Sequence, residues 1–367
     1  MSARPVIIMA GGTGGHVFPA LALARLLRAS SCEVVWLGTR RGLEARIIPA
    51  ERIAIEWLSI GGVRGKGLLT WLAAPFRLSL ALAQALAVMR RHRPSAVVGL
   101  GGFVTGPGGV AAWLMRRPLL IHEQNAIAGF TNRCLAHLAR EVLEAFPGSF
   151  GAEVTAHAIG NPVRADIAAV AAPATRFAAR SGAIRLLVLG GSQGATRLNA
   201  MVPFALARAA AIQPFEVQHQ SGERWIEAAK RNYAEAGMSV RLQPFIEDMA
   251  AAYGWADLVI CRAGALTVSE LAAAGVGAIL VPFPAATDDH QTRNAAILVD
   301  DGAAVMIAER DLSSERLAAE LVRLCSGRGR LLAMAERARS LAKPRATQDL
   351  ADACVELARD SAVGGVA

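Results

Sequence analysis

Several features that would point to secretion, metal binding or nucleic-acid binding are scarce in this sequence. Its five cysteines are scattered and show no metal-ligand spacing, which is typical of a protein in a reducing cytosol. Tyrosine occurs only twice and no lysine-rich tract is present, so the sequence disfavours nucleic acid as a partner. No Asp-x-Asp motif follows a predicted strand, and we therefore expect neither a bound metal nor another cofactor.

A long uninterrupted hydrophobic run is absent as well. The most apolar stretch, residues 68–89, contains Pro75, Arg77 and Gln84, which argues against a helix that spans a membrane. Near the start, Arg4 and Pro5 lead directly into the short run "VIIM", which is too brief for the core of a signal peptide. These absences predict a protein of the cytosol or of the cytosolic side of a membrane.

Apolar and basic residues, in contrast, are abundant. The chain has 367 residues, of which 53% are hydrophobic, and this suffices for two domains of ordinary size with large cores. Its formal net charge of +9 predicts an acidic partner. An anionic membrane surface and a phosphorylated substrate both satisfy that charge.

Short β-branched runs alternate with longer segments rich in Ala and Leu along most of the chain. Apolar strands without polar alternation are buried on both faces, which is typical of parallel sheets covered by helices. We therefore predict the doubly wound α/β class, with strands at residues 6–10, 33–38, 96–100, 118–122, 184–190, 256–261 and 278–283.

The first strand of each half ends in a similar glycine-rich turn. Gly-Gly-Thr-Gly-Gly occupies residues 11–15, and Gly-Gly-Ser-Gln-Gly-Ala occupies residues 190–195. This repeat predicts two Rossmann-like domains that face one cleft. The expected parts are an N-terminal Rossmann-like domain at 1–160, a linker at 161–183, a C-terminal Rossmann-like domain at 184–342, a closing helix at 343–360 and a tail at 361–367.

The glycine-rich turns do not match the common nucleotide-binding motifs. A Walker A loop requires a lysine that is missing here, and the dinucleotide motif has Val17 in place of its third glycine. The second strand ends in "LGTRR" rather than in an acid for a ribose, which disfavours a nicotinamide or flavin dehydrogenase. Tight packing without a ligand remains an alternative for any one turn. A third turn, "GLGGFVTGPGG" at 99–109, favours two anion sites built from backbone N–H groups and helix N-termini.

An ordered set of motifs resembles the MurG family of glycosyltransferases. These motifs are "GGTGGHVFPA", "GGFVTGPGG", "HEQNAIAGFTN", "GNPVR", "GGSQGA", "CRAGALTVSELAAAG" and "DHQTRNA", and the resemblance runs from about residue 6 to about residue 295. It implies the two-Rossmann GT-B fold and a peripheral enzyme on the cytoplasmic side of the inner cell membrane. It also implies transfer of GlcNAc from UDP-GlcNAc to undecaprenyl-diphospho-MurNAc-pentapeptide, the step from lipid I to lipid II in peptidoglycan biosynthesis. A GT-B enzyme that uses another lipid or small-molecule acceptor is the alternative.

The same resemblance implies which residues contact the donor. They are Thr13, Gly14, Gly15, Asn125, Arg164, Ser192, Ile246, Ala265, Leu266, Thr267, Val268, Ser269, Glu270 and Gln291. Ser192 and its loop suit the UDP phosphates, and the Glu270 carboxylate suits the two ribose hydroxyls. A core position for Ile246, a helix-start position for Glu270 and a solvated linker charge for Arg164 remain alternatives. The acceptor diphosphate is assigned to the first and third glycine turns, through Gly14, Gly15, Gly102 and Gly106.

The implied reaction converts an α-linked donor sugar into a β-1,4-linked product, and it needs a base for the acceptor's 4-hydroxyl. His16 is the first candidate because it directly follows the first glycine turn and begins the next helix. A structural histidine that caps this turn is the alternative. His122 and Glu123, at the end of another predicted strand, are reserve candidates. We expect loop N–H groups and a helix dipole, rather than a metal, to stabilise the leaving UDP.

Residues 68–91 contain a predicted helix that starts near Pro75 and has more apolar surface than one core contact requires. Arg77, Gln84 and Arg91 form its single polar stripe, while Trp71 and Phe76 lie at its beginning. Further basic residues nearby are Arg90, Arg93, Arg116 and Arg117. An anionic membrane surface fits this composition, and a wholly buried helix is the alternative.

Overall fold

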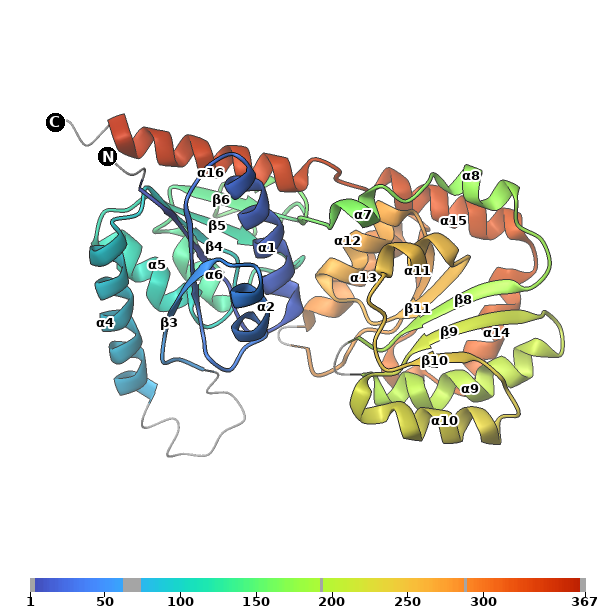
Figure 1. Cartoon of the computed structure of the whole chain (residues 1–367). Coiled ribbons are helices and arrows are strands. Elements are labelled where there is room, and N and C mark those ends of the chain that lie inside the picture. Colours follow the sequence, from blue (N-terminus) through green and yellow to red (C-terminus); the bar gives the residue numbers. More distant parts are fainter. Residues whose placement is uncertain (1–3, 62–73, 192–193, 287–288, 364–367) are drawn as a thin grey trace. The chain divides into compact units, whose positions relative to one another are not determined.

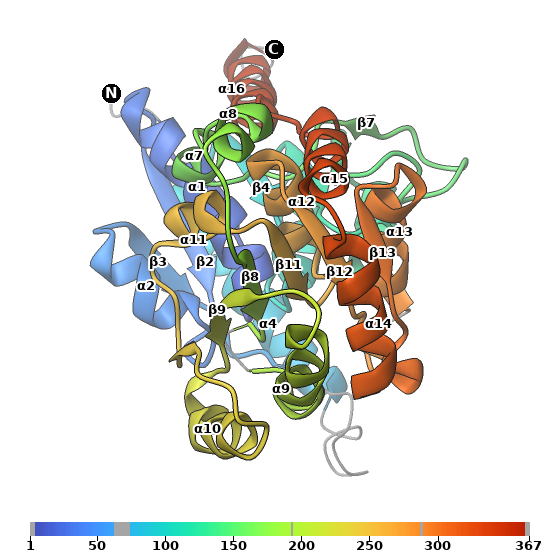
Figure 2. The ribbon, with the colours of Figure 1, turned by 90° about the vertical axis from the view of Figure 1, so that its right-hand side faces the viewer.

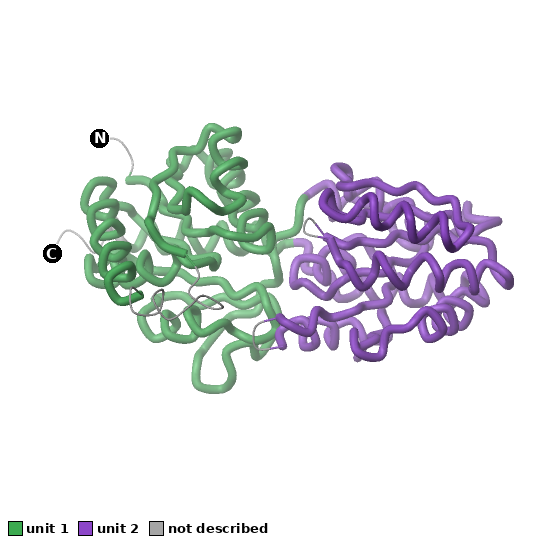
Figure 3. The backbone as a smooth tube through the Cα atoms, turned by 90° about the horizontal axis from the view of Figure 1, so that it is seen from below, with its two compact units in different colours: residues 1–164, 345–367 green, residues 165–344 purple. Residues whose placement is uncertain are grey.

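The computed structural model describes residues 4–61, 74–191, 194–286 and 289–363. Contacts between backbone segments divide the chain into two compact units (Figure 3). Unit 1 comprises residues 1–164 and 345–367, so it contains both ends of the chain, and unit 2 comprises residues 165–344. Each unit is built on one parallel sheet, and each is described here by itself.

The sheet of unit 1 has seven parallel strands in the order β3-β2-β1-β4-β5-β6-β7 (Figure 1). The elements along the chain are β1 (Val6–Met9), α1 (Gly14–Ala29), β2 (Val34–Gly38), α2 (Glu44–Ala50), β3 (Ala54–Trp57), α4 (Ala74–His92), β4 (Ala96–Gly99), α5 (Thr105–Leu114), β5 (Leu119–Glu123), α6 (Phe130–Ala136), β6 (Glu141–Glu144), β7 (His157–Ala158) and α16 (Ala346–Val363). The chain order reverses between β1 and β4, which is where open α/β sheets bind ligands.

Alternation along β1 divides the core of unit 1 between the two faces of the sheet. Val6 and Ile8 lie in one buried cluster with side chains of α1, α2 and α16, whereas Ile7 and Met9 lie in another with side chains of α4 and α5. Helix α16, which covers the predicted closing helix, therefore belongs to unit 1, where it packs on α1.

The sheet of unit 2 has six parallel strands in the order β10-β9-β8-β11-β12-β13, with helices on both faces (Figures 1 and 2). Its elements are α7 (Ala165–Ala168), α8 (Pro173–Ala178), β8 (Ile184–Leu189), α9 (Thr196–Ala210), β9 (Phe215–Gln220), η1 (Glu223–Trp225), α10 (Ile226–Glu235), β10 (Arg241–Gln243), α11 (Met249–Trp255), β11 (Leu258–Cys261), α12 (Ala265–Ala274), β12 (Gly277–Leu280), α13 (His290–Asp300), β13 (Ala304–Met306), η3 (Glu309–Asp311), α14 (Ser314–Cys325) and α15 (Arg328–Ser340). Here the reversal lies between β8 and β11, so both units repeat one topology.

Helix α4 turns much of its predicted polar stripe toward the protein. The Gln84 side chain accepts a hydrogen bond from the backbone N–H of Ser59 at 2.8 Å, and Arg91 forms an ion pair with Glu56 at 2.8 Å. Arg77, in contrast, is exposed near the start of the helix. Trp71 lies outside the described residues. In the part of the chain that the structure describes, no helix is both long and apolar enough to cross a bilayer.

Candidate active site

Two glycine-rich loops meet at the carboxyl ends of β1 and β4. Gly101 and Gly102 have φ angles of +100° and +83°, a region of the backbone map that favours glycine. A Cβ atom at Gly102 would overlap the carbonyl oxygen of Gly11, and one at Gly101 would overlap the imidazole of His16. The two loops therefore approach each other this closely because Gly101 and Gly102 have no side chains.

A buried carboxylate holds the first of these loops in place. Glu44, the first residue of α2, accepts hydrogen bonds from the backbone N–H groups of Gly12 and Thr39, each at 2.9 Å, and from the Thr39 hydroxyl at 2.8 Å. Cβ atoms at Gly11 and Gly38 would lie only 2.6 and 2.9 Å from the Glu44 side chain. The carboxylate therefore fits at this position because both neighbouring residues are glycines.

The predicted residues of the first loop lie at the N-terminus of α1. Thr13 is the N-cap, with an extended backbone, and Gly14 and Gly15 form the open first turn. The N–H groups of a first turn have no acceptor within their own helix, and the helix dipole gives them a partial positive charge. Gly106 occupies the corresponding turn of α5, directly after Gly102 and its loop. Both turns have the geometry of an anion site.

His16 is half-buried and is linked to the predicted reserve residue His122 through one glutamine. The Nδ1 atom of His16 lies 3.1 Å from Oε1 of Gln124, and the Gln124 Nε2 lies 3.1 Å from Nδ1 of His122. His122 is completely buried, and its Nε2 lies 2.9 Å from the carbonyl oxygen of Gly160. Burial lowers the pKa of His122, which keeps its imidazole neutral.

The Glu123 carboxylate is buried and organises the loop that follows β5. It accepts hydrogen bonds from the backbone N–H and the side-chain amide of Asn125, at 2.9 and 3.0 Å. It also accepts bonds from the Gly129 N–H at 3.1 Å and the Asn132 amide at 2.8 Å. Four donors occupy its two oxygens, and this arrangement fixes the position of Asn125.

In unit 2, the predicted donor residues lie at the carboxyl edge of its sheet. Residues 265–270 form the first turns of α12, and the Tyr253 hydroxyl donates to the Glu270 carboxylate at 3.0 Å. The side-chain oxygen of Gln291 accepts bonds from the N–H groups of Ala263 and Phe283. Ser192 lies outside the described residues, whereas Gly191 and Gly194 beside it both have positive φ angles.

Ile246 is buried, and its backbone N–H donates to the Gln220 side chain at 3.1 Å. A hollow of about 680 Å³ borders this residue and is also lined by Phe245, Trp255 and Gln218. Arg164, the last residue of the first segment of unit 1, is half-buried.

The comparisons with known proteins agree over almost the whole chain. Residues 6–144 match the N-terminal domain of glycosyltransferase family 28, and residues 185–350 match its C-terminal domain. The chain is 58% identical to a protein of Nitrosococcus oceani over 96% of this chain and 98% of that one. That relative is named UDP-N-acetylglucosamine--N-acetylmuramyl-(pentapeptide) pyrophosphoryl-undecaprenol N-acetylglucosamine transferase. A protein of Alkalilimnicola ehrlichii has the same name and is also 58% identical, over 97% of this chain and 99% of that one. The crystal structure of Acinetobacter baumannii MurG has a TM-score of 0.84 and 43% identity, covering 96% of this chain and 99% of that chain.

The chain belongs to the MurG family of glycosyltransferases.

The fold class predicted from the sequence is confirmed by these matches. Both units are Rossmann-like parallel sheets, as in the GT-B glycosyltransferases. The calicheamicin glycosyltransferase CalG4, at a TM-score of 0.66 and 19% identity over 97% of this chain and 99% of that chain, shares the fold.

Four side chains that support the site in this MurG-family chain were missed by sequence reasoning. They are Glu44, Gln124, Tyr253 and Gln220. Gln124 lies inside the motif "HEQN", next to residues that were singled out, so its position alone was a usable signal. Glu44 lies six residues beyond the end of β2, where a search for a ribose-binding acid directly after the strand does not reach.

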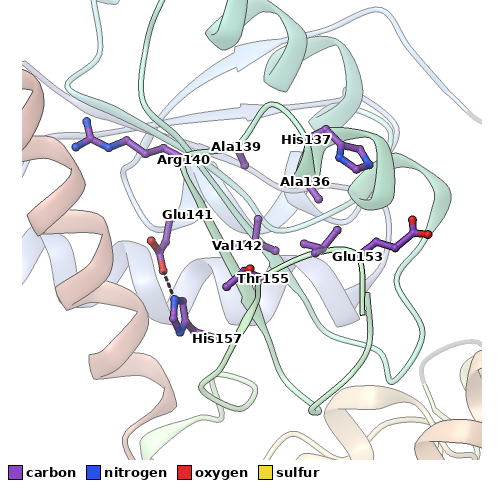
Figure 4. A pocket seen from close by; sticks show the side chains of 10 residues that line it. Ala136, His137, Ala139, Arg140, Glu141, Val142, Glu153, Thr155 and His157 are labelled. Carbon is purple, nitrogen blue, oxygen red and sulfur yellow. Dashed lines mark ion pairs between the residues drawn. The ribbon is translucent and has the colours of Figure 1, made fainter. Parts of the chain in front are cut away.

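A separate hollow of about 310 Å³ lies along β6 and β7 and contains none of the predicted site residues (Figure 4). His157 approaches Glu141 there at 3.9 Å, and Arg140 pairs with Asp360 of α16 at 2.8 Å. These charged groups already face one another, and the residues that line the hollow include none from the glycine loops.

Replacing Glu44 by Gln tests whether its carboxylate fixes the first loop. The amide would direct a donor toward either the Gly12 or the Thr39 N–H group, and this loss should lower the free energy of unfolding by about 1–3 kcal/mol. Urea denaturation measures the change. The matched control is Glu51→Gln, which removes the charge from a partly exposed pair with Arg25 and should cost about 0–1 kcal/mol. Equal stability losses in both variants would contradict the assignment.

Proposed function

We propose that this chain transfers GlcNAc from UDP-GlcNAc to the 4-hydroxyl of undecaprenyl-diphospho-MurNAc-pentapeptide, with inversion at the sugar's anomeric carbon. The observation that carries the proposal is the match, at 58% identity over nearly the full length, to relatives named for this transfer. The product is lipid II, so the chain acts in peptidoglycan biosynthesis, and through it in cell-wall growth, cell shape and division.

The donor contacts are carried chiefly by unit 2. Glu270, held by the Tyr253 hydroxyl, accepts hydrogen bonds from the ribose hydroxyls, and the N-terminus of α12 faces the diphosphate. Ile246 packs against the uracil, and the remaining unit 2 contacts are Ser192, residues 265–269 and Gln291. Unit 1 adds Thr13, Asn125 and Arg164. The backbone N–H of Ile246 is one group that could bond to the edge of the uracil. It already donates to the Gln220 side chain, so that hydrogen bond must break before the N–H can bind uracil.

The acceptor diphosphate occupies the paired glycine loops of unit 1. The open turns at Gly14, Gly15, Gly102 and Gly106 offer backbone N–H groups to the diphosphate. The positive ends of the α1 and α5 dipoles also stabilise its negative charge. Fixed N–H donors of this kind bind a diphosphate at no cost in side-chain ordering.

His16 is the base in this proposal. It takes the proton of the 4-hydroxyl as that oxygen attacks C1 of GlcNAc, while the C1–O bond to the diphosphate breaks and UDP leaves with the electron pair. The two reserve candidates already use their polar atoms in hydrogen bonds within the protein. His122 is completely buried with both ring nitrogens bonded, and Glu123 accepts four hydrogen bonds. His16, by contrast, is half-buried at the mouth of the first turn.

An exposed apolar surface on α4, formed by Phe76 and Leu80 on one face of the helix, supports docking to an anionic membrane. Phe76, Leu78 and Leu80 protrude from the first turns of α4, and Phe76 is 74% exposed. Trp113 and Leu114 are also exposed, at the end of α5. Basic residues on these helices and the turns that follow them, apart from Arg91 with its partner Glu56, are Arg77, Arg90, Arg93, Arg116 and Arg117. Each such charge near an anionic leaflet contributes about 1 kcal/mol, so we place the enzyme peripherally on the cytoplasmic face of the inner membrane.

The transfer assay tests the function and the base together. Purified protein is incubated with labelled UDP-GlcNAc and the lipid-linked muramoyl-pentapeptide, beside a His16→Ala variant. We expect labelled disaccharide-lipid from the wild type and a rate lower by about 10²–10⁴-fold in the variant, because general-base help contributes that much.

Other results of this assay would change the proposal. Equal rates in both proteins would remove His16 from the role of base and leave the function in place. Tight UDP-GlcNAc binding without product would mean that the acceptor is a different lipid or small molecule, as in other GT-B enzymes.

Membrane docking is tested by sedimentation with vesicles that contain phosphatidylglycerol. The double variant Phe76→Ser, Leu80→Ser should bind at least about tenfold more weakly, because each buried side chain of this size contributes about 1.5–3 kcal/mol. The control Ile212→Ser removes an equally exposed apolar side chain from unit 2 and should bind like the wild type. Equal binding by all three proteins would exclude this surface as the docking site.

A further inference from the structure

The hydrogen-bond chain that ends at His16 begins at a backbone carbonyl, which can act only as an acceptor. The backbone carbonyl of Gly160 can only accept a hydrogen bond, and it lies 2.9 Å from Nε2 of His122. The His122 Nε2 must therefore carry a proton. Because this imidazole is completely buried and neutral, its Nδ1 has no proton and must accept.

The next link fixes the orientation of the Gln124 amide. Its Nε2 lies 3.1 Å from Nδ1 of His122 and also 3.1 Å from the carbonyl oxygen of His122. Both of these atoms are acceptors, so the NH₂ end of the amide faces them and supplies one hydrogen to each. Two independent acceptors thus exclude the flipped amide.

With the amide oriented in this way, Oε1 of Gln124 faces His16. A carboxamide oxygen only accepts, and it lies 3.1 Å from Nδ1 of His16, so that nitrogen must donate. Gly101 packs directly on the same imidazole, and the lack of a side chain there allows the ring to take this position. In the neutral form of His16, the remaining ring nitrogen, Nε2, consequently holds the lone pair.

We propose that the Gly160 carbonyl, through His122 and Gln124, holds His16 in the tautomer with its proton on Nδ1 and thereby selects Nε2 as the proton acceptor. The second half of this statement rests on His16 being the base. Gln124 is a positioning residue in this proposal, because it acts through its hydrogen bond to His16. No proton travels along the chain: when Nε2 takes the acceptor's proton, the Nδ1–H bond to Gln124 stays as it is and faces the negative end of the amide dipole.

The wild-type protein, labelled with ¹⁵N-histidine, gives a direct readout by two-bond ¹H–¹⁵N correlation spectra. The His16 signals are identified by their loss in His16→Ala. The proposal predicts a protonated-type Nδ1 and a lone-pair-type Nε2 for His16, and the reverse pattern for His122. A His16 proton on Nε2 in the wild type would overturn it.

A Gln124→Leu variant tests the consequence for the reaction. Without the Oε1 acceptor, His16 loses its imposed tautomer, so kcat should fall by about tenfold or more while the KM for UDP-GlcNAc stays the same. Gln124→Glu keeps an acceptor oxygen toward His16, so it should preserve the His16 tautomer but displace the His122 signals. The control Gln84→Leu removes a glutamine that bonds Ser59 elsewhere in unit 1 and should leave the His16 spectrum unchanged.

The failures of the two proposals can be told apart. If His16 shows the predicted tautomer but His16→Ala retains transfer, the tautomer assignment stands and the choice of Nε2 as proton acceptor is overturned. If His16→Ala is inactive but the His16 proton is on Nε2, the base stands and the role of Gln124 is overturned. Unchanged kcat in Gln124→Leu would likewise contradict the positioning role.

Discussion

The ends of β1 and β4 approach closely because the loop after β4 carries no side chain where the two meet. Gly102 lies against the backbone of Gly11, and Gly101 lies against the ring of His16, so any Cβ at either position would push the loops apart. This contact places two helix N-termini and one imidazole in the same small region of unit 1. The buried Glu44 carboxylate reinforces it from the opposite side of the first loop.

In the proposed function, both units use the edge of the sheet where the strand order reverses, but the groups that they provide there differ. Unit 1 offers backbone N–H groups and a histidine, which suits a diphosphate and a proton transfer. Unit 2 offers a carboxylate, Glu270, and an amide, Gln291, whose positions are set by neighbouring protein groups. The division fits a transferase with a lipid diphosphate acceptor on one fold unit and a nucleotide sugar donor on the other.

The sequence predicted the parallel sheets and the glycine loops because both have strong local patterns: apolar runs without alternation, and glycines directly after them. It did not predict Glu44 or Gln124. Their roles depend on bonds to residues 32 and 108 positions away, which no local pattern encodes. The polar stripe of α4 could be predicted because Arg77, Gln84 and Arg91 are seven residues apart. Its partners Ser59 and Glu56 could not be predicted, because they lie on another segment of the chain.

The most direct test of this account is to measure acceptor kinetics and donor binding side by side in Gly102→Ala. The added Cβ would collide with the Gly11 backbone in a region of φ that already favours glycine. The account predicts that kcat/KM for the lipid-linked acceptor falls by about 10²-fold or more, while the Kd for UDP-GlcNAc is unchanged. Transfer at the wild-type rate, or a parallel loss of donor binding, would contradict it.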